Sequence, residues 1–300
     1  MEQSTLETRL LSGELDGELT TMYGAERLED ARSAVLSGFA KTFACLPEAL
    51  FSAPGRTELG GNHTDHQHGR VLAAAVNLDI LAAAAPNQSG MIRVQSEGYP
   101  LIVVDLKELT PKQGEENTSA ALIRGVAARM AALGCPLQDA GLDAYIVSNV
   151  PGGSGLSSSA AFEVLIGTML NALFWNGKSS AVEIAQIGQY AENVFFGKPC
   201  GLMDQTASSV GGLVYIDFRD PAHPVVENVE YDFDGCGYTL CIIDSGADHA
   251  GLTENYAAIP GELNKVCRVF GREYLRDVDE SEFYARLPEV RKVAGDRGAL

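Results

Sequence analysis

The stretch Gly152-Gly153-Ser154-Gly155-Leu156-Ser157-Ser158-Ser159-Ala160-Ala161 joins a strand-like run to a helix-like run. Residues 142–150 before it have the pattern of a partly buried strand that stops at Pro151, and apolar residues recur at helical spacing from 162 to 174 behind it, with a helix end expected at Gly177. Glycines let a backbone approach a ligand closely, and the first turn of a helix offers unpaired N–H groups at the positive end of its dipole. The stretch therefore predicts a loop that binds an anion such as a phosphate.

Other glycine-rich loops fit this stretch poorly. A Walker A loop requires Gly-Lys-Ser/Thr after its spacer, and no lysine closely follows Gly155. A dinucleotide-binding fingerprint requires a third glycine where Ser158 stands, and the Gly-x-Ser-x-Gly of a nucleophile elbow does not occur here. The remaining alternative is a flexible Gly/Ser turn before a core helix.

A second polar stretch, residues 53–70, reads Ala-Pro-Gly-Arg-Thr-Glu-Leu-Gly-Gly-Asn-His-Thr-Asp-His-Gln-His-Gly-Arg. A metal site built from His63, Asp65, His66 and His68 is disfavoured, because neither a His pair at i and i+4 nor a Cys partner completes a tetrahedral set. The structural alternative is a solvated turn. Donors and acceptors placed between glycines also suit a polyhydroxylated ligand, so this stretch predicts a sugar site.

A third stretch, Gly197-Lys198-Pro199-Cys200-Gly201-Leu202-Met203-Asp204-Gln205, follows a predicted helix that begins at Ser180 with Glu183 as its capping partner. Asp204 stands at the start of the next element. A carboxylate in this place either caps the helix or acts as a working acid or base, and this stretch taken alone favours the cap.

Together the three stretches resemble the GHMP family of small-molecule kinases and, within it, the galactokinases. Ala-Pro-Gly-Arg at 53–56, with Gly-x-His-Thr-Asp at 61–65 and Gly-x-Val-Leu at 69–72, is similar to the galactokinase sugar signature. Residues 151–161 resemble the family's nucleotide loop, and Cys-Gly-Leu-Met-Asp-Gln at 200–205 resembles the segment that carries its catalytic aspartate. His249 with Tyr256 adds a weaker match, and the resemblance spans about residues 30 to 270.

The resemblance implies an α+β fold in which two domains with mixed sheets and helices enclose the active site in a cleft. It implies transfer of the ATP γ-phosphoryl group to the anomeric hydroxyl of galactose, with Mg²⁺ as the metal. A break at Gly211-Gly212 places the expected domains at 1–210, holding the sugar signature and nucleotide loop, and at 211–300, expected to be incomplete.

The resemblance also implies roles for single residues. Asp204 would accept or orient the hydroxyl proton, and Arg56 would pair with Asp204 and steady the transferring group; whether Asp204 is a base or an electrostatic guide stays open. Ser159 and Glu192 match the magnesium positions. The implied sugar-binding residues are Asn62, His63, Asp65, Gly201 and Tyr256. The implied nucleotide-binding residues are Gly152, Gly153, Ser154, Gly155, Leu156, Ser157 and Ser158.

The sequence departs from the galactokinase pattern in two ways, of which the first bears on the substrate. Asn62 stands where the family usually has Glu, Glu58 where it often has Asn, and His66 where it usually has Tyr. The chain also lacks the glycine-rich motif that the family carries near its C-terminus, so we expect it to be a fragment of a longer kinase. A kinase for N-acetylgalactosamine or galacturonate, and a sensor that binds ATP and sugar without turnover, remain alternatives.

Composition indicates an ordinary globular enzyme. The formal net charge of −18 argues against nucleic acid and membrane partners, which would be repelled, and leaves sugar and ATP as the expected ligands. Six cysteines without Cys-x-x-Cys spacing, the absence of a secretory pattern at the N-terminus and the shortness of the apolar runs favour the cytoplasm. The sequence leaves the oligomeric state open, with a monomer favoured.

The sequence pattern predicts both helices and strands along the chain. Residues 1–46 have a helical pattern, strands are expected near 71–84, 91–95, 101–104 and 144–150, and a helix is expected over 119–133.

Overall fold

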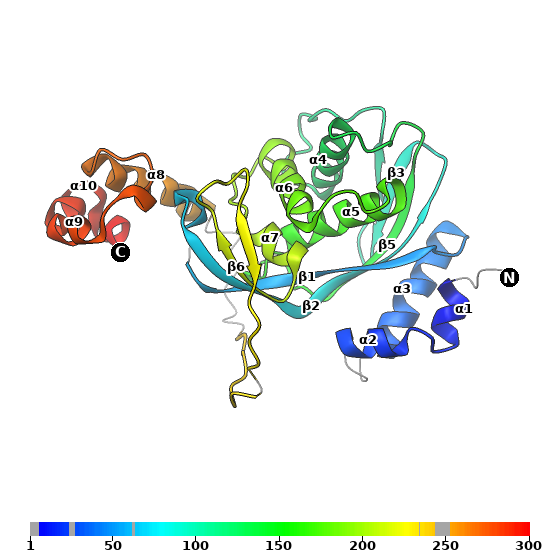
Figure 1. Ribbon diagram of the computed structural model, residues 1–300. Coiled ribbons are helices and arrows are strands. Elements are labelled where there is room, and N and C mark those ends of the chain that lie inside the picture. The colour runs from blue at the N-terminus through cyan, green and yellow to red at the C-terminus, as the bar shows by residue number, and fades with distance from the viewer. Residues whose placement is uncertain (1–5, 24–27, 62–63, 234, 244–252) are drawn as a thin grey trace.

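A seven-stranded mixed sheet forms the centre of the molecule (Figure 1). The structure is a computed structural model that describes residues 6–23, 28–61, 64–233, 235–243 and 253–300. The strands run in the order β4-β3-β5-β2-β6-β7, with β1 paired to β2 off this path; β3 and β5 are parallel and the other pairs are antiparallel. Their bounds are β1 Ala49–Gly60, β2 Arg70–Pro86, β3 Met91–Ser96, β4 Ile102–Asp105, β5 Leu142–Ser148, β6 Leu213–Asp217 and β7 Val225–Asn228.

The long strand β2 organises this sheet. One of its edges pairs with β1 along most of its length, and its other edge pairs with β6 over Arg70–Ala74 and with β5 over Ile80–Pro86. Residues 80–85 are all apolar and buried, because helices cover both faces of the sheet at this point. A continuous apolar run is the expected pattern of a strand that is buried on both faces.

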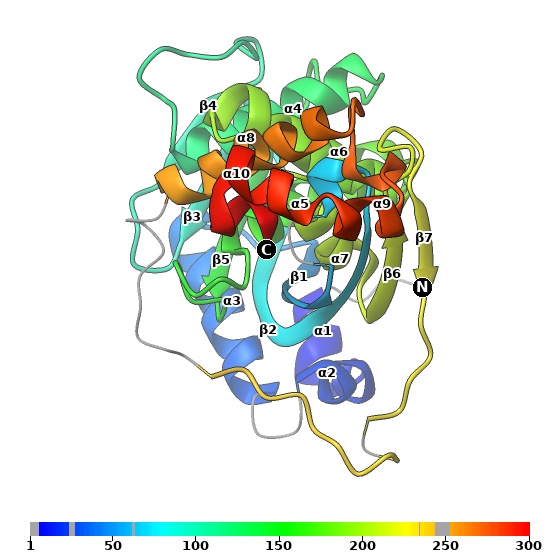
Figure 2. The ribbon, with the colours of Figure 1, turned by 90° about the vertical axis from the view of Figure 1, so that its left-hand side faces the viewer.

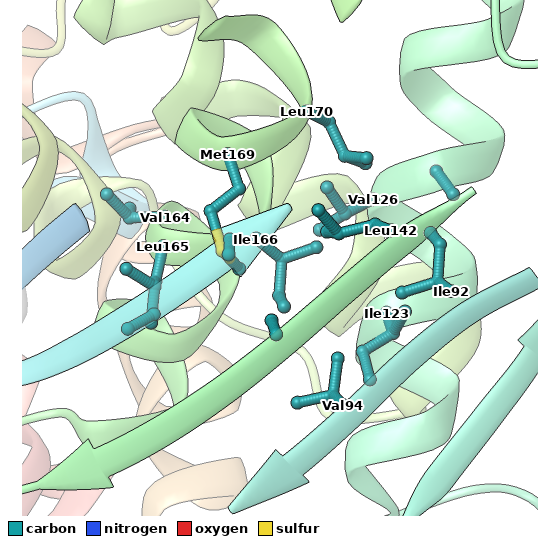
Figure 3. Close-up of a cluster of buried hydrophobic side chains, with 14 of the residues drawn as sticks. Ile92, Val94, Ile123, Val126, Leu142, Val164, Leu165, Ile166, Met169 and Leu170 are labelled. Atoms are coloured by element: carbon teal, nitrogen blue, oxygen red, sulfur yellow. The ribbon is translucent and has the colours of Figure 1, made fainter. Parts of the chain in front are cut away.

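Four helices cover one face of the sheet (Figures 1 and 2). They are α4 Ser119–Ala132, α5 Ser158–Trp175, α6 Ala181–Ala191 and α7 Met203–Val210. Helix α5 packs Leu165, Ile166 and Met169 against the sheet and α4 (Figure 3), and all three side chains are fully buried. Burial of each such side chain contributes about 1.5–3 kcal/mol. In the described part of the chain only α5 has the length and apolar composition of a membrane span, and its burial marks it as a core helix.

Helices α1 Leu6–Leu11, α2 Asp16–Tyr23 and α3 Leu28–Phe43 lie on the opposite face (Figure 1). Val35 and Phe39 of α3 are fully buried against the sheet residues Leu81 and Ala83. A Cβ atom at Gly38 would lie 2.2 Å from the ring of Tyr145, so the absence of a side chain there allows α3 to approach β5. These contacts explain why the helical N-terminal region belongs to the core.

The C-terminal helices lie beyond one end of the β1–β2 hairpin (Figures 1 and 2). They are α8 Thr253–Val269, the short 3-10 helix Leu275–Asp277, α9 Glu280–Ala285 and α10 Leu287–Ala299. Arg276 donates two hydrogen bonds to Asp217 of β6, at 2.6 and 2.9 Å, and the ring of Tyr274 stacks on His68 at a centroid distance of 3.6 Å. These contacts join the C-terminal region to the sheet and to the loop after β1.

The predicted elements agree closely with the observed ones. The strands expected at 71–84, 91–95, 101–104 and 144–150 occur as β2 to β5, each within two residues at either end, and α4 begins at the expected residue. Helix α5 ends at Trp175, two residues before Gly177. The sheet continues across the predicted domain boundary, because β6 pairs with β2. The division into 1–210 and 211–300 stays a prediction.

Candidate active site

Arg56 and Asp204 form an ion pair although 148 residues separate them in the sequence. Arg56 lies in β1, just after a bulge between Pro54 and Arg56 that leaves Gly55 out of register. Its Nε donates to Asp204 Oδ1 at 2.8 Å, and its Nη1 donates to the carbonyl oxygen of Gly155 at 2.6 Å. A hydrogen bond between a guanidinium and a carboxylate is charge-assisted and fixes the position of both groups.

Asp204 is the second residue of α7, and its side chain does not cap that helix. Its Oδ2 accepts a hydrogen bond from Ser157 Oγ, while Oδ1 is held by Arg56. The N-cap residue of α7 is Leu202, which makes no side-chain cap bond. The capping role favoured by the third stretch alone is therefore not the observed one, and the carboxylate points across to the loop before α5.

The loop at 152–157 directly precedes α5. Gly153 and Gly155 have positive φ values of 70° and 77°, and Ser157, the N-cap residue of α5, has a left-handed conformation with φ 57°. Left-handed geometry is costly for a residue with a side chain and is found at functional sites. Gly152, Gly153 and Gly155 are exposed, whereas Leu156 is buried and anchors the loop. Exposed backbone thus lies next to a helix N-terminus, as an anion site requires.

Ser159 and Glu192 meet beside this loop. Ser159 Oγ lies 3.2 Å from Glu192 Oε1, although the two residues belong to different helical segments. Glu192 begins a π-helical turn, Glu192–Phe196, that directly continues α6, whose start carries the predicted capping box of Ser180 and Glu183. Such turns are rare and occur frequently at functional sites. The amine of Lys198 lies 3.5 Å from the same oxygen of Glu192.

The predicted sugar-binding residues Asp65 and Gly201 are in close contact. Asp65 begins a short 3-10 helix, Asp65–Gln67, and its side chain is 9% exposed. A Cβ atom added to Gly201 would lie 1.6 Å from Asp65 Oδ2, so only glycine leaves room for this carboxylate. Asn62 and His63 lie outside the described residues, as does the side chain of Tyr256, whose backbone belongs to α8.

Glu58, which departs from the galactokinase pattern, lies near the candidate site residues Arg56, Asp65 and Asp204. It lies two residues after Arg56 in β1, and its Oε1 is buried without a hydrogen-bond partner among the described atoms. Burial raises the pKa of Glu58, the charge of Arg56 lowers it, and the charges of Asp65 and Asp204 raise it. The alternation of β1 could have placed its side chain on the same face as Arg56.

The described residues contain no cluster of three or more His, Cys, Asp or Glu side chains that could hold a metal by themselves. The pair Ser159 and Glu192 offers one hydroxyl and one carboxylate. Magnesium prefers hard oxygen ligands and keeps several waters, so this donor set fits it. The fit rests on donor chemistry and on the 3.2 Å separation of the two oxygens.

Comparison with known proteins agrees with this arrangement. Residues 121–212 match the N-terminal domain of the GHMP kinases, and residues 37–86 match the galactokinase galactose-binding signature. The curated galactokinase of Streptomyces coelicolor is 31% identical over 255 residues, which are 84% of this chain and 64% of the relative. The galactokinase of Glaesserella parasuis is 34% identical over 262 residues, 85% of this chain and 65% of the relative.

The chain belongs to the GHMP kinase family. The crystal structure of Lactococcus lactis galactokinase complexed with galactose has the same fold, with a TM-score of 0.70 at 24% identity over 89% of this chain and 69% of that one. Mevalonate kinase from Methanococcus jannaschii matches with a TM-score of 0.51 at 17% identity, over 82% of this chain and 78% of that one.

The matched regions of this GHMP kinase contain the residues brought together above. The galactose-binding signature includes Arg56, Glu58 and Asp65, and the N-terminal kinase domain includes the glycine-rich loop, Glu192 and Asp204. The chain spans less than two thirds of the length of the two curated relatives described here.

Proposed function

We propose that this GHMP kinase transfers the γ-phosphoryl group of ATP to the anomeric hydroxyl of galactose, giving galactose 1-phosphate and ADP. The observation that carries the proposal is that Arg56 and Ser157 each donate a hydrogen bond to one oxygen of Asp204. Arg56 also donates to Gly155 of the glycine-rich loop. Phosphoryl transfer needs mainly positioning and charge neutralisation. The family and its curated galactokinase relatives support the same activity.

In this proposal, Asp204 orients the sugar hydroxyl and receives its proton. Arg56 is paired with Oδ1 of this carboxylate, and carboxylate oxygens can accept a hydrogen bond from the sugar hydroxyl. Arg56 is also bonded to the carbonyl of Gly155, so its guanidinium stands where the nucleotide loop and the sugar-binding stretch meet. From there it can neutralise charge on the transferring group.

The backbone of residues 152–158 would bind the phosphates of ATP, because its glycines are exposed and the first turn of α5 offers unpaired donors. Ser159 and Glu192 would hold Mg²⁺, which supplies neutralising charge at the phosphates when it is bound. Asn62, His63, Asp65, Gly201 and Tyr256 would surround the sugar. We place this activity in the cytoplasm.

A kinase for another sugar is favoured by one observation. Glu58 adds a partly buried carboxyl group beside Arg56, Asp65 and Asp204, and Asn62 removes one from the loop. Redistribution of hydrogen-bond donors and acceptors changes which hydroxyl pattern a site accepts. N-acetylgalactosamine and galacturonate are the alternative acceptors.

The test is ADP release by the purified chain with Mg²⁺, ATP and a panel of galactose, N-acetylgalactosamine, galacturonate and glucose. Galactose-dependent release of ADP together with galactose 1-phosphate supports the proposal. Release with only another sugar favours the alternative kinase. Sugar binding without ADP release from any member of the panel identifies a sensor and refutes the catalytic proposal.

A further inference from the structure

A buried polar network contacts the carboxylate of Glu192. Glu163 of α5 and Gln205 of α7 are both fully buried, and Glu192 is 2% exposed. Charged side chains are almost never fully buried unless they have polar partners. Two buried glutamates on facing elements therefore require an explanation.

The amide nitrogen of Gln205 joins the two carboxyl groups. Gln205 Nε2 donates to Glu163 Oε2 at 3.1 Å and to Glu192 Oε2 at 2.9 Å, which accounts for both of its hydrogens. The opposite amide orientation would place the acceptor oxygen of Gln205 against Glu192 Oε2, so the orientation is assigned from this contact. The sulfur of Cys200, 3.6 Å from the same nitrogen, adds only a weak acceptor.

The two carboxylate oxygens of Glu192 have different partners. Oε2 is held from behind by Gln205, whereas Oε1 faces Ser159 Oγ at 3.2 Å and Lys198 Nζ at 3.5 Å. A carboxylate fixed through one oxygen can present the other oxygen in a single direction. Gln205 directly follows Asp204 in α7, so the same residue also links the Glu192 carboxylate to the segment that carries the proposed proton acceptor.

We propose that Gln205 and Glu163 are positioning residues for Glu192: Glu163 holds the Gln205 amide as an acceptor, and that amide fixes Oε2 of Glu192 so that Oε1, which faces Ser159, is directed toward Mg²⁺. This inference rests on the proposed function, because it concerns the metal that the proposed reaction needs. Both residues are fully buried and therefore have no surface on which to bind a substrate. Partners behind a ligand orient it, and their loss costs about 10–100-fold in metal affinity or activity.

Burial, followed by the nearby charge of Glu192, raises the pKa of Glu163 well above its ordinary value. Gly188 of α6 packs against both side chains, and a Cβ atom there would lie 3.1 Å from Glu163 Cβ and 3.2 Å from Gln205 Cγ. The network is thus enclosed by three helices and cannot relax toward solvent.

The test measures how strongly Mg²⁺ increases the affinity for ADP. Calorimetry of the full chain is carried out with Mg²⁺ and with a chelator, and this measurement does not depend on turnover. Gln205→Met and Glu163→Met keep the side-chain volume and remove the donor or the acceptor. Each is expected to reduce the Mg²⁺-dependent gain in ADP affinity by about tenfold, while ADP binding in the chelator stays within about twofold of wild type. Glu163→Gln keeps an acceptor oxygen and is expected to retain the gain.

Asn171→Ala is the matched control. Asn171 lies on α5 two turns beyond Glu163 and makes two buried hydrogen bonds with Ser179, at 2.9 and 3.0 Å, without contact to Glu192. Its loss destabilises the same helix and is expected to leave the Mg²⁺ effect unchanged. If the Gln205 and Glu163 variants only lose stability, the melting temperatures of all variants fall alike and the Mg²⁺ effect on ADP binding is unchanged. That result would overturn the inference.

The remaining outcomes separate this inference from the proposed function. A full Mg²⁺ effect in Glu163→Met, or a lost effect in Glu163→Gln, overturns the acceptor role of Glu163, and this pair decides the matter if Gln205→Met does not fold. Wild-type protein that shows the Mg²⁺ effect but phosphorylates no sugar refutes the activity and leaves the inference standing. Wild-type ADP binding that ignores Mg²⁺ overturns the inference.

Discussion

Arg56 Nε donates to Asp204 Oδ1 at 2.8 Å, and this contact joins strand β1 to the first turn of helix α7. Ser157 holds the other oxygen of the same carboxylate, so Asp204 is fixed from two sides at the nucleotide loop. Because Asp204 is 33% exposed and Arg56 is 13% exposed, the pair lies at the surface of a site rather than in the core. A role in stability alone would not require the side chain of Asp204 to be accessible to solvent.

Asp204→Asn is expected to lower kcat by about 100-fold or more, since the amide cannot accept the hydroxyl proton. Sugar binding should stay largely intact, because the amide keeps one acceptor oxygen and nearly the same shape. Steady-state kinetics and sugar binding by calorimetry check both statements. Turnover close to that of wild type would limit Asp204 to a structural role.

Gly201→Ala is expected to raise the KM for the sugar at least several-fold. Its Cβ atom would lie 1.6 Å from Asp65 Oδ2, so this carboxylate must move, and Asp65 is a predicted sugar ligand. ATP binding should change little. Gly261→Ala is the control, since nothing lies within 4 Å of its added Cβ. An unchanged KM in Gly201→Ala would show that Asp65 does not contact the sugar.

Most of the fold could be predicted from sequence, because its elements depend on local patterns. The alternating or continuous apolar runs of β2 and β5 and the capping box at Ser180 follow short-range rules. The placement of β6 beside β2 could not be predicted in this way, because that pairing joins residues far apart in the chain. The sheet therefore crosses the position where glycines suggested a boundary.

The contacts of the candidate site also join residues far apart in the chain and could not be predicted from local patterns. Asp204 alone favoured a helix cap, and only the resemblance to a family paired it with Arg56; the pairing is a contact across 148 residues. Gln205 and Glu163 carried no sequence signal, because a buried polar network has no periodic pattern of its own. Its partners become visible only when α5 and α7 pack together.

Asn62→Glu is expected to change the relative rates for different sugars more than the affinity for ATP. The change restores the carboxylate that the galactokinase pattern has at this position, and it alters the hydrogen-bond acceptors available to a hydroxyl. Because Glu58 places a carboxyl group near Asp65, the double variant Asn62→Glu with Glu58→Asn should shift the profile further toward galactose. Rates across the sugar panel measure the effect. Identical profiles for all three proteins would remove both residues from sugar selection.

Asp217→Asn is expected to destabilise the protein at neutral pH and not at low pH. Hydrogen bonds from Arg276 lower the pKa of Asp217 from 3.8 to about 2, so the ionised carboxylate stabilises the folded state above pH 3.8. That contribution, roughly 1–2 kcal/mol after allowance for solvent screening, is lost as the pH falls from about 4 to about 2. Urea unfolding of wild type and variant across this range should show a difference that shrinks with acidity. Asp139→Asn makes the same charge change at an exposed position and controls for net charge. A difference that is independent of pH would contradict the ion pair between β6 and the C-terminal region.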